Sequence, residues 1–216
     1  MKCQFPELLR TILSLGAILG VLASYSGAAA AECRPERFAK CQGAMLANVT
    51  WKGADLSGGD FRNANFDGAN LEGAQFKGGD LRGANLKFAR MERSDLSDAN
   101  LEGADVRSAN LRYANLSRAQ LKDANLSKAR LDSADLAHAR LNGADLSRSQ
   151  LVGADLQHAD LRDARLVGAF LNYSNLKQAN LSGTSIQRSR IIGARLTNAI
   201  WVNGKVCSAT SVGSCE

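Results

Sequence analysis

Apolar residues recur at every fifth position through most of the chain. From Leu46 to Trp201 this series has 32 positions, all of them apolar and without a shift of phase, and 23 of them are leucine. Two positions earlier stands a small residue, Ala in 24 units, and the residue between the two is Asp or Asn in 18 units. A period of five fits neither a helix nor a flat strand. The chain must therefore turn within every unit.

This pattern predicts a solenoid in which each five-residue unit points two side chains inward. The small and the apolar residue are two apart, so they lie on the same side of an extended segment, and the other three positions face water. Gly stands two positions after the apolar residue in 12 units, for example at Gly53 and Gly193, which favours a tight turn with positive φ. Stability is then approximately a sum of nearest-neighbour terms, and both ends of the stack need caps.

The first 31 residues differ in kind from the repeats. Lys2 and Arg10 flank the start, an apolar run extends from Thr11 to Ala23, and small residues lead to Ala31. This order is typical of a cleaved secretory signal peptide, with cleavage after Ala30 or Ala31. The run is shorter than the roughly 20 residues of a transmembrane helix, and an uncleaved anchor is the alternative. We expect an exported protein, periplasmic or extracellular.

Composition and charge narrow the class further. Aromatic residues make up 6% of the chain, which argues against a core of large side chains. Removal of residues 1–31 changes the net charge from +6 to +5, and this excess weakly favours acidic partners. Four cysteines remain in two pairs of identical spacing, and an even number in an exported chain indicates disulfides. These cysteines are Cys33, Cys41, Cys207 and Cys215.

The repeated A(D/N)LXX unit resembles the pentapeptide-repeat family over residues 44–201. The resemblance implies an all-β fold, a right-handed quadrilateral β-helix with four units per coil and about eight coils. At a strand spacing of about 4.8 Å the rod would be roughly 38 Å long. The implied organisation is a signal peptide at 1–31, an N-terminal cap at 32–43, repeats at 44–202 and a C-terminal cap at 203–216.

The implied rod also determines the cysteine pairing. Bridged Cα atoms lie within about 7 Å, which is far less than the distance between the ends of the rod. The resemblance therefore implies two local bridges, Cys33 with Cys41 and Cys207 with Cys215. Each closes a short loop and should contribute roughly 2 to 3 kcal/mol in the chain-entropy model.

The two histidines, His138 and His158, are 20 residues apart. The implied coil stacks them in one column, about 5 Å apart, and two imidazoles at that distance could share a transition metal. The alternative is an ordinary solvated turn position, because no third ligand is evident. We expect no cofactor.

Outward apolar residues cluster near the C-terminal end. Four of them fall on one face of the last three coils: Val152, Phe170, Tyr173 and Ile192. A clustered apolar patch is typical of a partner surface, and the alternative is that the C-terminal cap covers it. A column of arginines, Arg90, Arg130 and Arg190, would suit anionic lipid, polysaccharide or an acidic protein.

The sequence favours a non-enzymatic function. No nucleotide-binding loop, paired metal thiolates or nucleophile elbow appears, so we expect no enzyme activity. Some members of the family imitate duplex DNA and regulate type II topoisomerases, but that implies a cytoplasmic rod with negative faces, and direct DNA binding lacks a basic stripe. We expect an exported scaffold or protein-interaction module that binds an unknown protein or envelope component. One alternative is a metal-binding periplasmic protein that uses the two histidines, and another is a DNA-mimic topoisomerase regulator.

Overall fold

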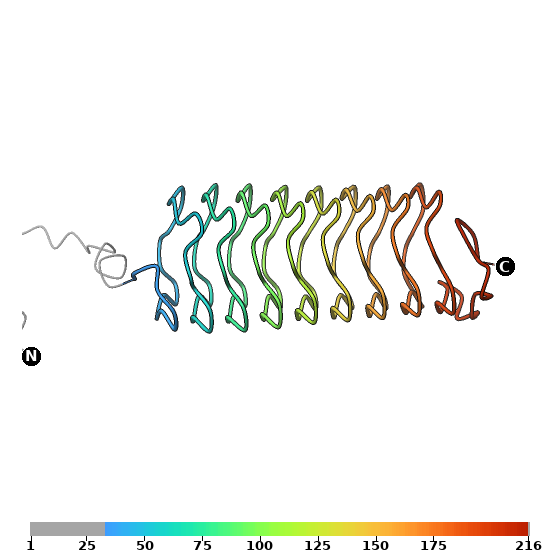
Figure 1. Ribbon diagram of the computed structural model, residues 1–216, viewed down its shortest axis with the longest axis horizontal. Coiled ribbons are helices and arrows are strands. Elements are labelled where there is room, and N and C mark those ends of the chain that lie inside the picture. The colour runs from blue at the N-terminus through green and yellow to red at the C-terminus, as the bar shows by residue number, and fades with distance from the viewer. Residues whose placement is uncertain (1–32, 216) are drawn as a thin grey trace, which may run out of the picture.

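The computed structural model describes residues 33–215, which form one long stack of coils (Figure 1). The predicted signal peptide lies outside the described residues. Each coil takes 20 residues, because every bridging residue pairs in parallel with the one 20 positions later, from Lys40 with Asp60 to Asn180 with Ile200. The predicted solenoid with four units per coil is confirmed.

No helix and no continuous strand occurs within residues 33–215. Every fifth residue from Lys40 to Ile200 makes isolated parallel β-bridges, and a turn separates consecutive bridges along the chain. The expected β-helix is therefore a stack whose ladders are one residue wide on each of four sides. The described residues also contain no helix long and apolar enough to cross a membrane.

A unit with Asp or Asn before the inward leucine can satisfy all five of its backbone N–H groups, as residues 114–118 illustrate. The N–H groups of Leu116 and Arg118 donate to the next coil at 2.6 and 2.9 Å, and that of Asn115 donates to the previous coil at 2.9 Å. The Ala114 N–H closes the preceding turn at 3.1 Å. The fifth, Ser117 N–H, donates to the Asn115 side-chain oxygen at 3.0 Å. Asp and Asn recur before the inward leucine because they supply this acceptor.

The turns share one geometry. The third residue of every turn, at five-residue intervals from Phe38 to Asn198, has φ between 55° and 72°, as a type II turn requires. Glycine fills only some of these positions, and the others hold side chains as large as Tyr113 and His138. The glycine pattern therefore predicted the conformation correctly, and the fold imposes it on non-glycine residues at a cost of roughly 1 to 2 kcal/mol each.

The core is a set of inward columns that exclude water almost completely. Leucines such as Leu56 and Leu136 are 0% exposed. Near the N-terminal end, Phe61, Phe66 and Phe76 pack against one another with ring centroids 5.5 to 6.0 Å apart. Gly59 replaces the usual alanine there, because a Cβ at that position would overlap the Phe61 ring.

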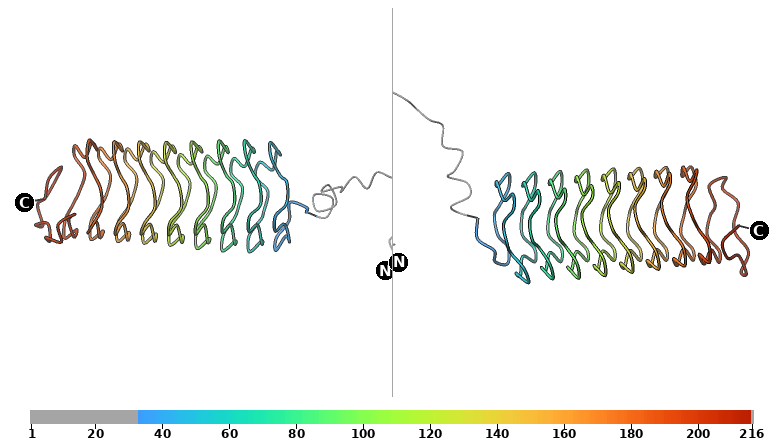
Figure 2. Two further views of the ribbon diagram at one scale, coloured as in Figure 1. Left: turned by 180° about the vertical axis from the view of Figure 1, so that it is seen from behind. Right: turned by 90° about the horizontal axis from the view of Figure 1, so that it is seen from above.

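Both ends carry the predicted disulfides. Cys33 is bonded to Cys41 with Cα atoms 5.0 Å apart, and Cys207 to Cys215 with Cα atoms 4.8 Å apart. After the last coil the chain reverses at Gly204. Residues 202–215 form what we call the C-terminal hairpin, which lies at one end of the rod (Figure 2). Each disulfide therefore holds together its own end of the stack.

Candidate interaction face

One side of the rod carries all seven residues predicted to bind a partner. It consists of the units whose inward residues include Leu71, Leu111 and Leu151, and we call it the tyrosine face because Tyr113 and Tyr173 project from it. The bridges that run through Arg90, Arg130, Phe170 and Arg190 place these residues along its middle. The arginine column and the apolar cluster therefore belong to one surface.

The apolar cluster, which we call the C-terminal patch, consists of Val152, Phe170, Tyr173 and Ile192. Tyr173 is 68% exposed and Ile192 is 66% exposed. Phe170 is half-buried, and the guanidinium carbon of Arg190 lies 5.1 Å from its ring centroid. This cation–π contact joins the arginine column to the apolar patch.

The C-terminal hairpin leaves this patch uncovered. Val206 pairs with Ile200 and Val212 pairs with Arg195, both antiparallel, on two other sides of the coil. Tyr173 packs instead over Gly193, where a Cβ would lie 2.5 Å from its ring. The patch is therefore an exposed surface within residues 33–215.

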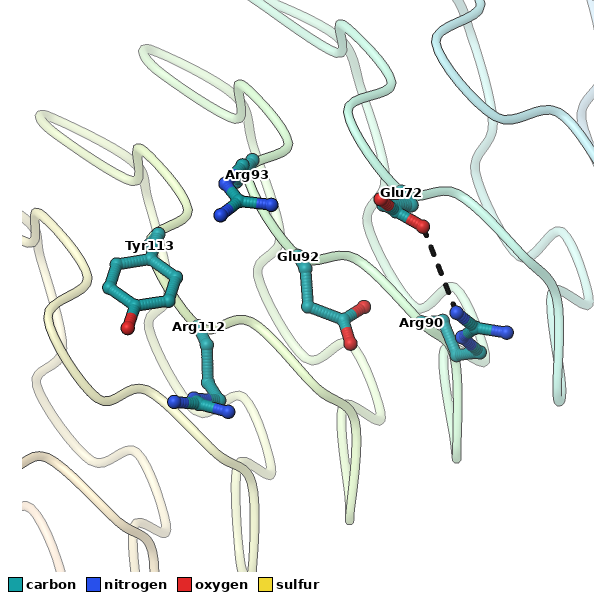
Figure 3. A pocket seen from close by; sticks show the side chains of 6 residues that line it. All are labelled: Glu72, Arg90, Glu92, Arg93, Arg112 and Tyr113. Atoms are coloured by element: carbon teal, nitrogen blue, oxygen red, sulfur yellow. Dashed lines mark ion pairs between the residues drawn. The ribbon is translucent and has the colours of Figure 1, made fainter.

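A shallow charged pocket lies farther along the same face, toward the N-terminal end (Figure 3). Its lining residues are Glu72, Arg90, Glu92, Arg93, Arg112 and Tyr113. The Tyr113 ring lies beside two guanidinium carbons, 5.6 Å from that of Arg93 and 5.4 Å from that of Arg112. Glu72 pairs with Arg90 at 3.7 Å and with Lys52 at 3.1 Å.

The charged groups of this pocket are only partly paired. Glu92 accepts a hydrogen bond from Asn110, while its second carboxylate oxygen is buried without a partner among residues 33–215. The Nε atom of Arg112 is also buried without a hydrogen bond, although that side chain lies 3.8 Å from Asp132.

Four Asp-x-Arg units add bidentate ion pairs on the surface. In one of them, Arg107 donates to the two carboxylate oxygens of Asp105 at 2.8 and 2.7 Å. The side-chain hydrogen bond from arginine holds the carboxyl pKa below its ordinary value in each unit. The acids with lowered pKa values are Asp60, Asp80, Asp105 and Asp160.

The two histidines stack as their spacing predicted. Their ring centroids lie 4.6 Å apart and the planes differ by 10°. Both residues occupy the positive-φ turn position, and the preceding members of the same column, Asp98 and Arg118, form an ion pair at 2.7 Å. Residues 33–215 hold no group of three or more His, Cys, Asp or Glu side chains arranged for a metal. Metal binding by this pair stays a prediction.

Charge is distributed unevenly along the rod, a feature that the net charge of the chain does not reveal. Residues 33–163 contain 19 cationic and 18 acidic residues, whereas residues 164–215 contain six cationic residues and no acidic one. None of these six has an ion pair among the described residues. The C-terminal end is therefore a cationic pole, formed by Arg165, Lys177, Arg188, Arg190, Arg195 and Lys205.

Comparison with known proteins identifies the repeat. A family model described as pentapeptide repeats matches in eight copies, and the matched ranges together run from residue 37 to residue 198. Comparison with curated proteins finds no match. Among similar solved structures is Rfr23, a pentapeptide-repeat protein of the cyanobacterium Cyanothece 51142. It is 38% identical, with 43% of this chain and 63% of that chain covered and a TM-score of 0.42.

Two further similar structures cover more of the chain. HetL, a pentapeptide-repeat protein involved in heterocyst differentiation regulation in Nostoc sp. strain PCC 7120, is 31% identical over 77% of this chain and 91% of its own, with a TM-score of 0.24. A trypsin-treated form of QnrB1, a plasmid-mediated fluoroquinolone resistance protein, is 19% identical over 76% of this chain and 81% of its own, with a TM-score of 0.40.

Proposed function

The chain belongs to the pentapeptide-repeat family, and from that premise we propose that it is a non-enzymatic exported scaffold that binds another protein through the C-terminal patch. The patch carries the proposal. Three of the nine large apolar side chains that are exposed among residues 33–215 lie in this patch, and two of them, Tyr173 and Ile192, are more than 60% exposed on one face. Exposed aromatic side chains beside an arginine are typical of binding hot spots.

The form of the scaffold is part of the proposal. We infer a right-handed quadrilateral β-helix, supported by the four bridges per 20-residue coil and by the family. Its four flat sides hold side chains at fixed spacings, and a rigid surface loses little entropy on binding.

Export is supported by the signal-like residues 1–31 and is compatible with two disulfides, which persist in oxidising compartments. We expect the protein purified from its native compartment to begin at Ala31 or Glu32 and to contain no free thiol. Intact-mass measurement with and without reduction tests both points. A chain that retains Cys3 and residues 1–31 would contradict export by cleavage.

Affinity capture tests the patch. The mature, oxidised protein should recover a specific partner from the envelope fraction, and a variant with Phe170→Ser and Tyr173→Ser should not. The matched control carries Phe88→Ser and Tyr113→Ser, which remove two exposed aromatic side chains outside the patch. The purified partner should bind the wild type and the Phe88→Ser, Tyr113→Ser control with similar affinity and the Phe170→Ser, Tyr173→Ser variant more weakly. Equal recovery by all three proteins would reject the patch as the binding site.

A second candidate function, metal binding, is favoured by the 4.6 Å separation of the His138 and His158 rings. Because the rings are parallel, a shared ion would require at least one of them to rotate, and its other ligands would be water molecules. Isothermal titration of Zn²⁺ into the wild type and into His158→Ala tests this function. Absence of metal-dependent heat in both proteins rejects it.

A further inference from the structure

The C-terminal hairpin caps only two of the four sides of the last coil. Its backbone accepts hydrogen bonds from the N–H groups of Leu196 and Asn198 at 3.0 and 3.2 Å. In return, the Gly213 and Cys207 N–H groups donate to the carbonyls of Ala194 and Ala199, each at 2.8 Å. These bonds complete the ladders on the sides centred on Leu196 and Trp201.

The other two sides have no such cover. In the preceding coil, the N–H groups of Leu166, Gly168 and Leu171 donate to carbonyls of the last coil at 2.7 to 2.9 Å. The equivalent groups one coil later, on Ile186, Arg188 and Ile191, donate to nothing within residues 33–215. The carbonyls of Thr184 and Ser189 likewise accept no backbone hydrogen bond from the described residues. We call the backbone from Thr184 to Ile191 the open edge.

Burial changes at the same place. Leu166 and Leu171 are each 1% exposed, whereas Ile186 and Ile191, at the equivalent positions of the last coil, are only partly buried. Ile192, from the C-terminal patch, adds an exposed apolar side chain beside the edge. An unpaired edge flanked by apolar side chains is the arrangement that accepts an added strand.

Charge indicates what kind of strand it accepts. The open edge lies in the cationic pole, and its own Arg188 and Arg190 are exposed without an ion pair among the described residues. A second copy stacked end to end is disfavoured, because residues 33–52 carry four cationic residues and one acidic residue and like charges would face each other. An acidic partner would be attracted to the same end.

We propose that the open edge accepts an acidic segment of another protein, which turns once over Arg188 and pairs with the backbone on both open sides. The segment's carbonyls accept from Ile186, Arg188 and Ile191, and its N–H groups donate to Thr184 and Ser189. Its acidic side chains meet Arg188 and Arg190. This inference rests on the proposed interaction role and names the chemistry of one partner segment.

Fluorescence anisotropy with the mature oxidised protein tests the proposal. The probe is a labelled nine-residue peptide of alternating Glu and Val, and the comparison peptides have Lys in place of Glu or a methyl group on every backbone nitrogen. We expect saturable binding of the Glu-Val peptide and at least tenfold weaker binding of both comparison peptides. Hydrogen exchange at Ile186, Arg188 and Ile191 should slow when the Glu-Val peptide is bound.

Two sets of variants locate the site. Ile191→Pro removes one free donor without breaking a bond within the described residues and should weaken binding at least tenfold. Arg188→Glu with Arg190→Glu should do the same. The control, Arg140→Glu with Arg148→Glu, makes the same charge change at two exposed arginines of earlier coils, and it should leave the affinity within about twofold of wild type.

Several results would overturn the proposal. The proposal is wrong if the Glu-Val peptide does not bind, or if the methylated peptide binds equally well. It is also wrong if the bound peptide slows hydrogen exchange only at residues outside the open edge, or if the protein binds anionic phosphatidylglycerol vesicles but not the peptide. A concentration-dependent dimer in sedimentation that Ile191→Pro abolishes would assign the edge to a second copy instead. If Ile191→Pro fails to fold, the methylated peptide and the exchange data still decide. The Phe170→Ser and Tyr173→Ser capture is a separate assay, so failure of the edge leaves the patch standing.

Discussion

The Asp123 side chain lies against Gly143, which occupies the equivalent position of the next coil. One of its carboxylate oxygens occupies the space that a Cβ at Gly143 would need, and Gly143 itself has φ of 72°. This glycine is therefore required for two reasons, its backbone conformation and the close approach of a neighbouring side chain. Gly103, in the same column, has φ of 65° and nothing within 4 Å of an added Cβ.

These two glycines give a matched pair of substitutions. Gly103→Ala introduces only the left-handed conformation and should destabilise the rod by roughly 1 to 2 kcal/mol. Gly143→Ala should cost more, because Asp123 must also move. The difference should vanish in an Asp123→Ala background, as measured by urea unfolding in a double-mutant cycle. If the two single substitutions lower the free energy of unfolding equally, the Asp123 side chain can move away without a measurable cost.

The side-chain acceptor before the inward leucine should contribute measurably to stability. Asn115 accepts from the Ser117 N–H at 3.0 Å and from the Ser117 hydroxyl at 2.7 Å. Asn115→Ala leaves that N–H without its acceptor and should cost about 1 kcal/mol in urea unfolding. The control is Gln120→Ala, at the same position of the next unit, where the side chain caps no N–H among the described residues. A loss as large for Gln120→Ala would remove the explanation for the Asp and Asn preference.

Acid should weaken the rod through the Asp-x-Arg units. Hydrogen bonding to Arg107 lowers the pKa of Asp105 in the folded protein. The resulting stabilisation is therefore fully present above the unfolded pKa of about 4 and is lost as the pH falls through the lower, folded value. Asp105→Asn keeps the acceptor for the Arg107 N–H but removes the charge. Between pH 5 and pH 2 the urea midpoint of this variant should therefore fall less than that of the wild type.

The comparison for this effect is Asp145→Asn. Asp145 caps the Ser147 N–H at 2.9 Å but pairs with no arginine among residues 33–215. Its substitution should leave the acid dependence close to that of wild type. If the urea midpoint of Asp105→Asn depends on pH as strongly as that of the wild type, this exposed ion pair contributes nothing measurable to stability, as is common for surface pairs.

The sequence predicted the features that repeat. A five-residue period sustained from Leu46 to Trp201 leaves few arrangements that bury every apolar side chain. The 20-residue coil then follows from the family resemblance, and the stacked histidines follow from the coil. Register in such a stack is fixed locally, so spacing alone placed Phe170 next to Arg190.

The features that do not repeat were harder to predict. The open edge depends on the path of residues 202–215, which fold back antiparallel and, among the described residues, accept no hydrogen bond from the Ile191 N–H, and no period encodes that path. The pocket around Tyr113 depends on side-chain rotamers from three coils. The cationic pole was readable from the sequence, because no acidic residue follows Asp163 until Glu216, but it appears only when charge is followed along the axis.

Each disulfide should protect its own end of the rod and little else. In a solenoid, contacts run only between neighbouring coils, so loosening one end need not unfold the middle. Replacing Cys207 and Cys215 with Ser should lower stability by roughly 2 to 3 kcal/mol. It should also speed hydrogen exchange at least tenfold at Leu196 and Asn198, whose N–H groups donate to the hairpin. Exchange at Leu116, in the central coils, should not change.

The opposite end supplies the control for this prediction. Replacing Cys33 and Cys41 with Ser should speed exchange near Phe38 and Cys41, whose N–H groups donate to the second coil at 3.0 and 2.8 Å, and should leave Leu196 as protected as in wild type. Loss of protection along the whole rod in either variant would contradict the nearest-neighbour description. The caps would then be needed for the entire stack to remain folded, and the hairpin beside the open edge would control the stability of the whole scaffold.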